Sequence, residues 1–323
     1  MPVAKPQRLI FGEALMELGQ TDRRIVVLDA DVSSSTQTRL FAEAHPDRFF
    51  NFGIAEANMV SAAAGLASCG FVPVVSSFAL FVSLRAAEQV RAQVAFTNLN
   101  VKLIGGYAGL SDYADGASHQ SVEDLAVMRA IPNMTVIAPG DGVQTRLALR
   151  ASVEHHGPVF LRISREAVPR DLAPASVLNT FAIGKGIRLR EGVDVALITT
   201  GTMTDTVLEA AAQLEAVGVS AAVLHLHTVK PIDERLLVET ARACGAMVTV
   251  EEHSIIGGLG SAVCEAICQS YPVPVIRFGI GDRFGESGNY ADVLRRAGLD
   301  CASIVRAAGR ALELKRMNHA PVD

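Results

Sequence analysis

The feature that most constrains the fold is a series of short, continuously apolar runs separated by segments with helical periodicity. In the first half these runs are IVVLDAD (25–31), FVPVVSSF (71–78), VKLIGG (101–106), MTVIAP (134–139) and PVFLRIS (158–164). Because such strands are apolar on both sides, both faces of their sheet must be covered, which is typical of a parallel sheet between two layers of helices. The first half is therefore predicted to be α/β.

A second series of the same kind follows the irregular, proline-containing stretch 165–180. Strands are expected in VDVALITT (193–200), AAVLHLHTV (221–229), AMVTVEEH (246–253) and PVIRFGI (274–280), with helices over 204–218 and 259–271. We expect two α/β domains, 1–175 and 191–323, joined by a linker over 176–190. Each is expected to have its own mostly parallel, helix-covered sheet.

Composition excludes several functional classes. The net charge of −5 and the pI near 5.9 provide no positive field for nucleic acid or anionic lipid. The five cysteines lack the spacing of a metal site, which favours reduced thiols in a reducing compartment. The first residues do not resemble a signal peptide, so a cytoplasmic location is expected. The uncharged stretch 57–84 is broken by serines and by the Gly70–Pro73 turn, which predicts buried core and no membrane span. Half of the residues are hydrophobic, which favours a large subunit interface.

Three segments carry candidate chemistry. NFGIAEANM (51–59) places Glu56 at the start of an apolar helix, SSFALF (76–81) places Phe78 and Phe81 at a strand end, and DGASHQSVED (115–124) contributes Asp115 and His119. Each has an ordinary structural interpretation, because helix-start acids, core aromatics and solvated loop residues are common. Their combination in this order is specific.

With LRISRE (161–166), VEEHSIIGGLGSAV (250–263) and DRFGESG (282–288), these segments resemble the transketolase and deoxyxylulose-phosphate synthase family. The resemblance runs nearly end to end but covers only the latter half of full-length members. It implies a pyrimidine-binding domain followed by a transketolase C-terminal domain. It also implies the β subunit of a split, thiamine-diphosphate-dependent transketolase that transfers a two-carbon ketol unit from a ketose or ketose phosphate to an aldose.

The resemblance assigns roles to individual residues. Glu56 matches the acid that hydrogen-bonds the aminopyrimidine of the cofactor, a role that requires a dry pocket that raises its pKa. Phe78 and Phe81 match the aromatics that flank this ring, and a third aromatic of the family falls at Leu84. His119 and Asp115 match residues that contact substrate hydroxyls and move protons.

A further set matches the groups that bind a sugar phosphate. Arg8, Ser35 and Arg165 fall at these positions, and guanidinium groups suit phosphate because they bind it in a bidentate fork. A phosphate-binding histidine of the family falls at about Tyr107, so the substrate is expected to be an unusual phosphorylated sugar or an unphosphorylated one.

The cofactor's diphosphate is expected to be held elsewhere. The chain contains Gly140, Asp141 and Gly142, but these residues lack the asparagine of the family's diphosphate motif, and Asp141 is expected to cap the next helix. The GGLG turn (257–260) is expected to be a strand-to-helix turn. No metal site is expected in this chain. We expect Mg²⁺ and the diphosphate on a separate N-terminal-type (alpha) subunit, and a homodimer of this chain within an α2β2 assembly.

Other functions remain open from the sequence. The β subunit of a 2-oxo-acid dehydrogenase has the same domain order, and a deoxyxylulose-phosphate-synthase-like enzyme is a further variant. A non-catalytic scaffold is disfavoured because it has no physical need for Glu56, Phe78, Phe81, Asp115 and His119 together.

Overall fold

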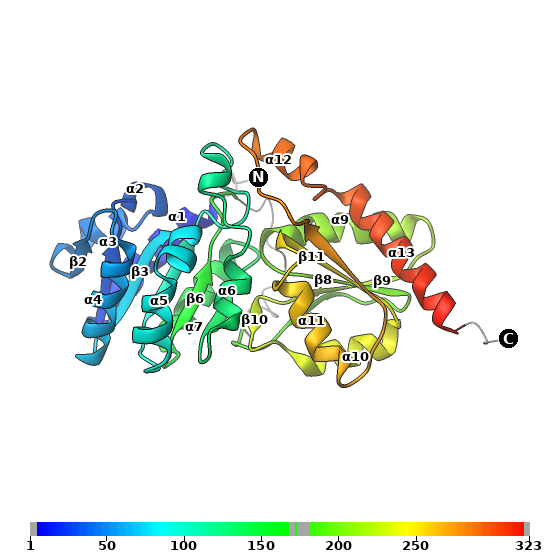
Figure 1. The fold of residues 1–323 in the computed structure, drawn as a ribbon, viewed down its shortest axis with the longest axis horizontal. Helices are drawn as coiled ribbons and strands as arrows, with labels where there is room; N and C mark the ends of the chain where they lie inside the picture. Colours follow the sequence, from blue (N-terminus) through cyan, green and yellow to red (C-terminus); the bar gives the residue numbers. More distant parts are fainter. Residues whose placement is uncertain (1–4, 168–171, 173–180, 320–323) are drawn as a thin grey trace.

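The structure, a computed structural model, describes residues 5–167, 172 and 181–319. Two sheets, each with helices on both faces, lie side by side along the long axis of the molecule (Figure 1). The fold class predicted from the sequence is confirmed.

The first sheet has seven strands in the order β10-β5-β6-β4-β3-β1-β2, and all neighbouring pairs are parallel except the antiparallel pair of β10 with β5. Its strands are β1 (Ile25–Asp29), β2 (Phe49–Asn51), β3 (Val72–Phe78), β4 (Lys102–Gly106), β5 (Thr135–Ile137), β6 (Val159–Arg162) and β10 (Thr228–Lys230).

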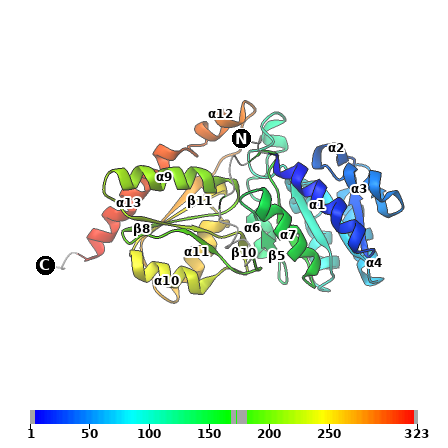
Figure 2. The same cartoon turned by 180° about the vertical axis from the view of Figure 1, so that it is seen from behind.

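Alternate strand residues of this sheet face two separate cores. Val26 and Leu28 pack in the core beneath α4 (Glu56–Ser68), η2 (Phe81–Arg85), α5 (Ala87–Gln89), η3 (Val90–Ala95) and α6 (Asp124–Ala130). Ile25 and Val27 pack on the opposite face against α1 (Gln7–Thr21), α3 (Arg39–Ala44) and α7 (Gly142–Glu154), and α1 and α7 are in front in Figure 2. Three short helical turns complete this half: α2 (Ser33–Thr36), η1 (Pro46–Arg48) and η4 (Gly116–Ser118).

The second sheet has the strand order β12-β11-β8-β9-β7. Its strands are β7 (Ile187–Arg190), β8 (Val195–Thr199), β9 (Ala221–His225), β11 (Met247–Ser254) and β12 (Val275–Ile280). On one face lie η5 (Gly201–Met203), α9 (Thr204–Ala216), α12 (Tyr290–Arg296) and α13 (Cys301–His319), and on the other α10 (Glu234–Cys244) and α11 (Leu259–Cys268).

The structure differs from the sequence prediction in how the halves are connected. The run AAVLHLHTV, predicted as one strand, forms β9 of the second sheet and then β10 of the first, so the expectation of fully separate sheets was wrong. Backbone hydrogen bonds hold this crossing of the chain between the two sheets; in one of them the Ala138 N–H donates to the His227 carbonyl at 2.7 Å.

Two strands were not anticipated. These are β2 and β7, and β7 lies within the range expected to be linker. Of the remaining expected linker, residues 176–180 lie outside the described residues. None of the helices in the described part of the chain combines the length and apolar character that a membrane span requires.

Candidate active site

The candidate site lies where the parallel strands of the first sheet end. Ser35 follows β1, Glu56 follows β2, Phe78 is the last residue of β3, Tyr107 follows β4 and Arg165 follows β6. These strands are parallel neighbours, so their carboxyl ends meet at one edge. In α/β proteins this edge is where ligands bind.

Glu56 begins α4 and is buried, with 2% of its surface exposed. The Ser77 hydroxyl donates to its Oε1 at 3.3 Å, and the Arg85 Nη1 donates to its Oε2 at 2.8 Å. The expected burial of this carboxylate is therefore present. Its ion pair with Arg85 was not anticipated, because Arg85 is 29 residues away and nothing in the sequence links the two.

An aromatic group lies next to Glu56. Phe78 and Phe81 are stacked with ring centroids 6.0 Å apart, and Phe78 stacks on Tyr107 at 4.6 Å. His119 lies edge-on to both phenylalanines, 5.3 Å from Phe81 and 6.1 Å from Phe78. Leu84 lies in η2, the helical turn that begins at Phe81, and its side chain is exposed. The structure therefore brings His119 to the two aromatics, a contact that the sequence did not predict.

Arg8, Ser35 and Arg165 meet around Tyr107. The Arg8 guanidinium donates to the Ser35 carbonyl at 3.1 Å and to the Tyr107 hydroxyl at 2.6 Å. The Arg165 guanidinium lies 5.2 Å from the centre of the Tyr107 ring. In this structure Ser35 contributes its carbonyl to Arg8.

Tyr107 has a backbone φ of +56°, which non-glycine residues rarely adopt and which is frequent at functional sites. Its ring is buried between the phenylalanine pair and the two arginines. The sequence marked this position only as a departure from the family, but the structure places it at the centre of the site.

A carboxylate pair, Asp112 and Asp115, lies on the same loop. Asp112 is fully buried, with Arg165 Nη1 3.8 Å from its Oδ1. Burial, followed by the charge and hydrogen bonding of Asp115, raises the pKa of Asp112 to about 7. Two interacting carboxyls titrate as a unit, so the pair holds a proton near neutral pH. Asp115 was predicted as a site residue; Asp112 was missed, since a loop aspartate carries no signal of burial.

The second domain holds this loop in place. The Gly288 N–H donates to the Tyr113 carbonyl at 2.9 Å, and the Gln120 amide donates to the Glu286 carbonyl at 2.9 Å. Gly116 has a φ of +76°, and a Cβ there would lie 2.1 Å from the Ser287 hydroxyl. DRFGESG thus packs against residues 107–123, which carry Asp115 and His119 and are called the substrate loop because the resemblance assigns these two residues to the substrate.

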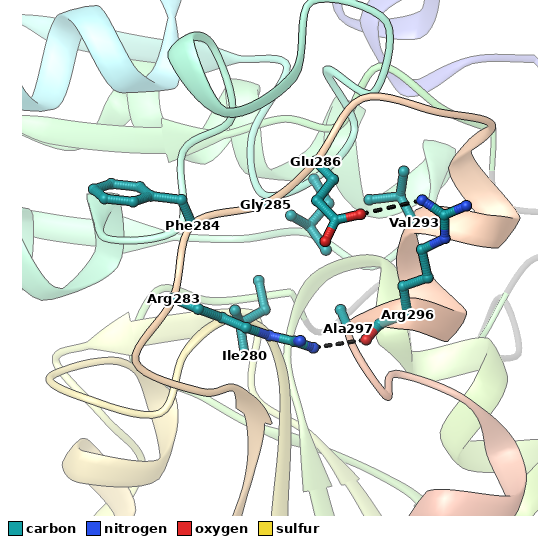
Figure 3. Close-up of a pocket in the computed structure, with 9 residues that line it drawn as sticks. Ile280, Arg283, Phe284, Gly285, Glu286, Val293, Arg296 and Ala297 are labelled. Atoms are coloured by element: carbon teal, nitrogen blue, oxygen red, sulfur yellow. Dashed lines mark hydrogen bonds and ion pairs between the residues drawn. The ribbon is translucent and has the colours of Figure 1, made fainter.

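A small pocket lies behind this segment (Figure 3). Arg296 spans the pocket: its backbone carbonyl accepts from the Arg283 guanidinium at 2.6 Å, and its own guanidinium pairs with the Glu286 carboxylate at 3.1 Å. Phe284 points away from the other side chains. None of the predicted site residues lines this pocket. The contacts of Arg296 with Arg283 and Glu286 hold DRFGESG, the segment that packs against the substrate loop.

The two glycine-rich motifs are satisfied by the chain itself. Asp141 caps α7, as predicted, accepting from the Gln144 N–H at 2.7 Å, and it also accepts from the Leu172 N–H at 2.8 Å. At GGLG, the Glu251 carboxylate accepts from the Leu259 and Gly260 N–H groups at 2.6 and 2.8 Å. Neither motif is open to an external phosphate. Among the described residues, no group of three or more His, Cys, Asp or Glu side chains is placed to hold a metal ion.

A two-domain α/β chain with a buried acid and stacked aromatics at the strand ends is the arrangement of thiamine-diphosphate pyrimidine-binding subunits. Residues 5–170 match the family model "Transketolase, pyrimidine binding domain" and residues 184–304 match "Transketolase, C-terminal domain". The chain belongs to the transketolase family.

Relatives of similar length support this assignment. A putative transketolase C-terminal section from Methanocaldococcus jannaschii is 46% identical over 308 residues, covering 94% of this chain and 95% of the relative. A 6-deoxy-6-sulfo-D-fructose transketolase subunit from Clostridium sp. is 42% identical over 305 residues, covering 94% of each chain.

Longer relatives and solved structures agree with this assignment. A 1-deoxy-D-xylulose-5-phosphate synthase from Symbiobacterium thermophilum is 41% identical over 303 residues, which are 93% of this chain and 46% of that enzyme. The solved structure described as "Split gene transketolase, inactive beta4 tetramer" superposes with a TM-score of 0.88 at 46% identity, covering 98% of this chain and 100% of the other.

Domains of this family imply dependence on thiamine diphosphate, and the residues present fit its pyrimidine. A guanidinium, which is planar and carries N–H donors, already lies over Phe81 while donating to the buried Glu56. The same pair of groups therefore suits a planar nitrogen ring, with Glu56 at the ring nitrogen and Phe81 at the ring face.

Proposed function

We propose that this chain is the β, C-terminal subunit of a split transketolase that moves a two-carbon ketol unit from a ketose or its phosphate to an aldose. One observation carries the proposal. Glu56, the Phe78–Phe81 pair and His119 lie together at the same strand edge as the Arg8–Tyr107–Arg165 group.

The roles proposed for the side chains follow from their chemistry. Bound thiamine diphosphate supplies an electron sink for cleaving the bond beside a ketose carbonyl. Glu56, buried and able to hold or release a proton, acts at the pyrimidine nitrogen, and Phe78 and Phe81 orient the ring. Histidine is a common general acid and base, and His119 with Asp115 moves protons at the substrate hydroxyls.

The proposed substrate is a sugar with an anionic end. Arg8 and Arg165 present two guanidinium groups close to the Tyr107 ring, and two such groups suit a phosphate or another tetrahedral anion. The relative described as a 6-deoxy-6-sulfo-D-fructose transketolase subunit acts on a sulfonated sugar, which supports an anion broader than phosphate.

The proposed partner is an N-terminal-type alpha subunit that holds the diphosphate and Mg²⁺, within an α2β2 assembly built on a homodimer of this chain. Exposed apolar side chains beside the site support a protein interface: Ile54 is 77% exposed and Leu84 is 42% exposed. These residues lie two residues before Glu56 and directly before Arg85. Asp141, the acid of the only GDG in the sequence, caps α7, which supports a diphosphate site on another chain.

The proposed division into two domains, 1–175 and 191–323 with the linker 176–190, is supported by the family matches over 5–170 and 184–304. The second match and β7 both begin before residue 191, which favours a shorter linker and an earlier start of the second domain. The cysteines, all five unpaired in the structure, support the proposed cytoplasmic location.

The test is reconstitution with a transketolase N-terminal-type alpha subunit. The pair, supplied with thiamine diphosphate and Mg²⁺, is expected to convert a ketose phosphate and an aldose into the two transfer products, with neither subunit active alone. Decarboxylation of pyruvate instead would favour the synthase alternative, and acyl transfer to a lipoyl carrier would favour the 2-oxo-acid dehydrogenase. Tight, Mg²⁺-dependent cofactor binding by the isolated chain would contradict the split arrangement.

A further inference from the structure

Arg85 contacts both groups that the proposed function assigns to the cofactor's pyrimidine. It ends η2, a single π-helical turn that begins at Phe81, and π-helical turns are frequent at functional sites. Its Nη1 donates to Glu56 Oε2 at 2.8 Å, and its guanidinium carbon lies 4.0 Å from the centre of the Phe81 ring.

A guanidinium and an aminopyrimidine have the same requirements here. Both are planar, both carry N–H donors for a carboxylate, and both stack on an aromatic face. Two planar groups cannot lie on one face of Phe81 and donate to the same oxygen of Glu56 at once. We infer that Arg85 occupies the pyrimidine position in the isolated subunit and swings out when the pyrimidine of thiamine diphosphate binds. This inference rests on the proposed function.

The burial of the two partners supports such an exchange. Glu56 is 2% exposed, so its charge without a partner would be strongly destabilising. The Arg85 side chain is 45% exposed, so its guanidinium is already partly hydrated in the ion pair and can move into solvent. Arg85 therefore stabilises the empty site and can leave it at low cost.

The ion pair is also incompatible with the proposed role of Glu56. While Arg85 donates to Glu56 Oε2, that oxygen is occupied and cannot share a proton with a ring nitrogen. Displacement of Arg85 therefore couples cofactor binding to release of Glu56 for proton transfer.

Calorimetry of the reconstituted complex tests the inference through cofactor affinity. In Arg85→Ala, thiamine diphosphate no longer has to displace the guanidinium, so its Kd is expected to fall by about tenfold, of the order expected for one displaced charged pair. Arg91→Ala, which removes an exposed arginine from η3, is the matched control and is expected to leave the Kd unchanged. An unchanged or higher Kd in Arg85→Ala would overturn the inference.

A second measurement needs neither cofactor nor partner. In the isolated chain at pH 8, Arg85→Ala is expected to lower the Tm by several degrees, because it leaves the Glu56 charge buried without a partner. Adding Glu56→Gln to Arg85→Ala is expected to restore part of this loss. Additive losses in the two single and the double variants would show that the ion pair is absent from the empty site. These results remain interpretable even when the reconstituted enzyme transfers no sugar.

Discussion

The carboxyl edges of the two sheets are built from the same architecture but differ in what satisfies their polar groups. At the first sheet, Arg8, Arg165 and His119 are partly exposed; both arginines contact Tyr107, and His119 contacts Phe81. At the second sheet, Glu251, Glu252 and His253 at the end of β11 are buried and are bonded by their own chain.

The buried edge joins the two domains. Glu252 accepts from the Leu110 N–H at 2.6 Å and from the Tyr290 hydroxyl at 2.8 Å, which ties β11 to the base of the substrate loop. Arg162 pairs with Asp124 at 2.8 Å and donates to the Glu252 carbonyl at 2.9 Å. The polar groups of the second edge are thus bonded within the chain, whereas those of the first edge remain partly exposed.

The largest expected effect comes from breaking the buried ion pair between Arg162 and Asp124. Arg162→Met leaves the fully buried Asp124 without its cation, and breaking a buried pair in this way typically costs about 3–5 kcal/mol. Urea denaturation of the isolated chain measures the free energy of unfolding. Arg150→Met, which breaks an exposed pair with Glu154, is the control and is expected to cost about 0.5 kcal/mol or less. Equal losses would mean that the buried Arg162–Asp124 pair contributes no more to stability than an exposed ion pair.

The next effect separates chemistry from packing at the open edge. Glu56→Gln keeps the size of the side chain but removes the carboxylate, so turnover by the reconstituted pair is expected to fall at least about 100-fold, or roughly 3 kcal/mol of barrier. Proton exchange at the cofactor's thiazolium carbon is the direct readout, and assembly is expected to survive.

Glu88→Gln, an exposed change on the neighbouring α5, serves as the control for Glu56→Gln. If Glu56 only complements the dipole of α4, the Gln variant instead keeps its turnover and loses at most about 1 kcal/mol of stability. Wild-type exchange rates in Glu56→Gln would show that the acid has been assigned wrongly.

The third prediction concerns pH. The pKa of Asp112 is raised to about 7 in the folded chain, above its ordinary value of 3.8, so the folded state retains a proton that the unfolded state has lost. Stability from this group is full below about pH 4 and is lost as the pH rises through 7. Wild-type chain is therefore expected to lose stability relative to Asp112→Asn between pH 4 and 7, by at most about 1.4 kcal/mol per pH unit.

Urea denaturation at several pH values measures this difference. Asp47→Asn, a change of an exposed aspartate in η1, is expected to leave the pH dependence as it is in the wild type. Parallel curves for wild type and Asp112→Asn would mean that the Asp112–Asp115 pair does not hold a proton near neutral pH.

The smallest expected effect concerns the GDG motif, residues 140–142. Asp141→Ala removes the cap of α7 and is expected to cost about 1 kcal/mol of stability, similar to Asp233→Ala at the start of α10. Cofactor affinity of the reconstituted complex, measured by calorimetry, is expected to be unchanged in both variants. Loss of affinity in Asp141→Ala alone would make the motif part of the diphosphate site.

Sequence alone determined the features that depend on local pattern. Continuous apolar runs predicted parallel strands, because a strand that is apolar on both faces needs helices on both faces. Capping by Asp141 could be predicted because a cap and its partner lie three residues apart. The motifs containing Glu56, Phe78 and His119 were recognisable in the sequence, but the contacts of His119 with the phenylalanines were not predicted.

Only the tertiary structure decided which distant groups meet. The crossing of β10 into the first sheet joins residues about 90 positions apart, and the Arg85–Glu56 and Glu252–Leu110 bonds join residues 29 and 142 positions apart. Hydrophobic periodicity records which way a side chain faces but not which side chain of another element faces it. The burial of Asp112, which raises the pKa of its carboxyl to about 7, is likewise visible only in the structure, where the second domain bonds to the same loop at Tyr113.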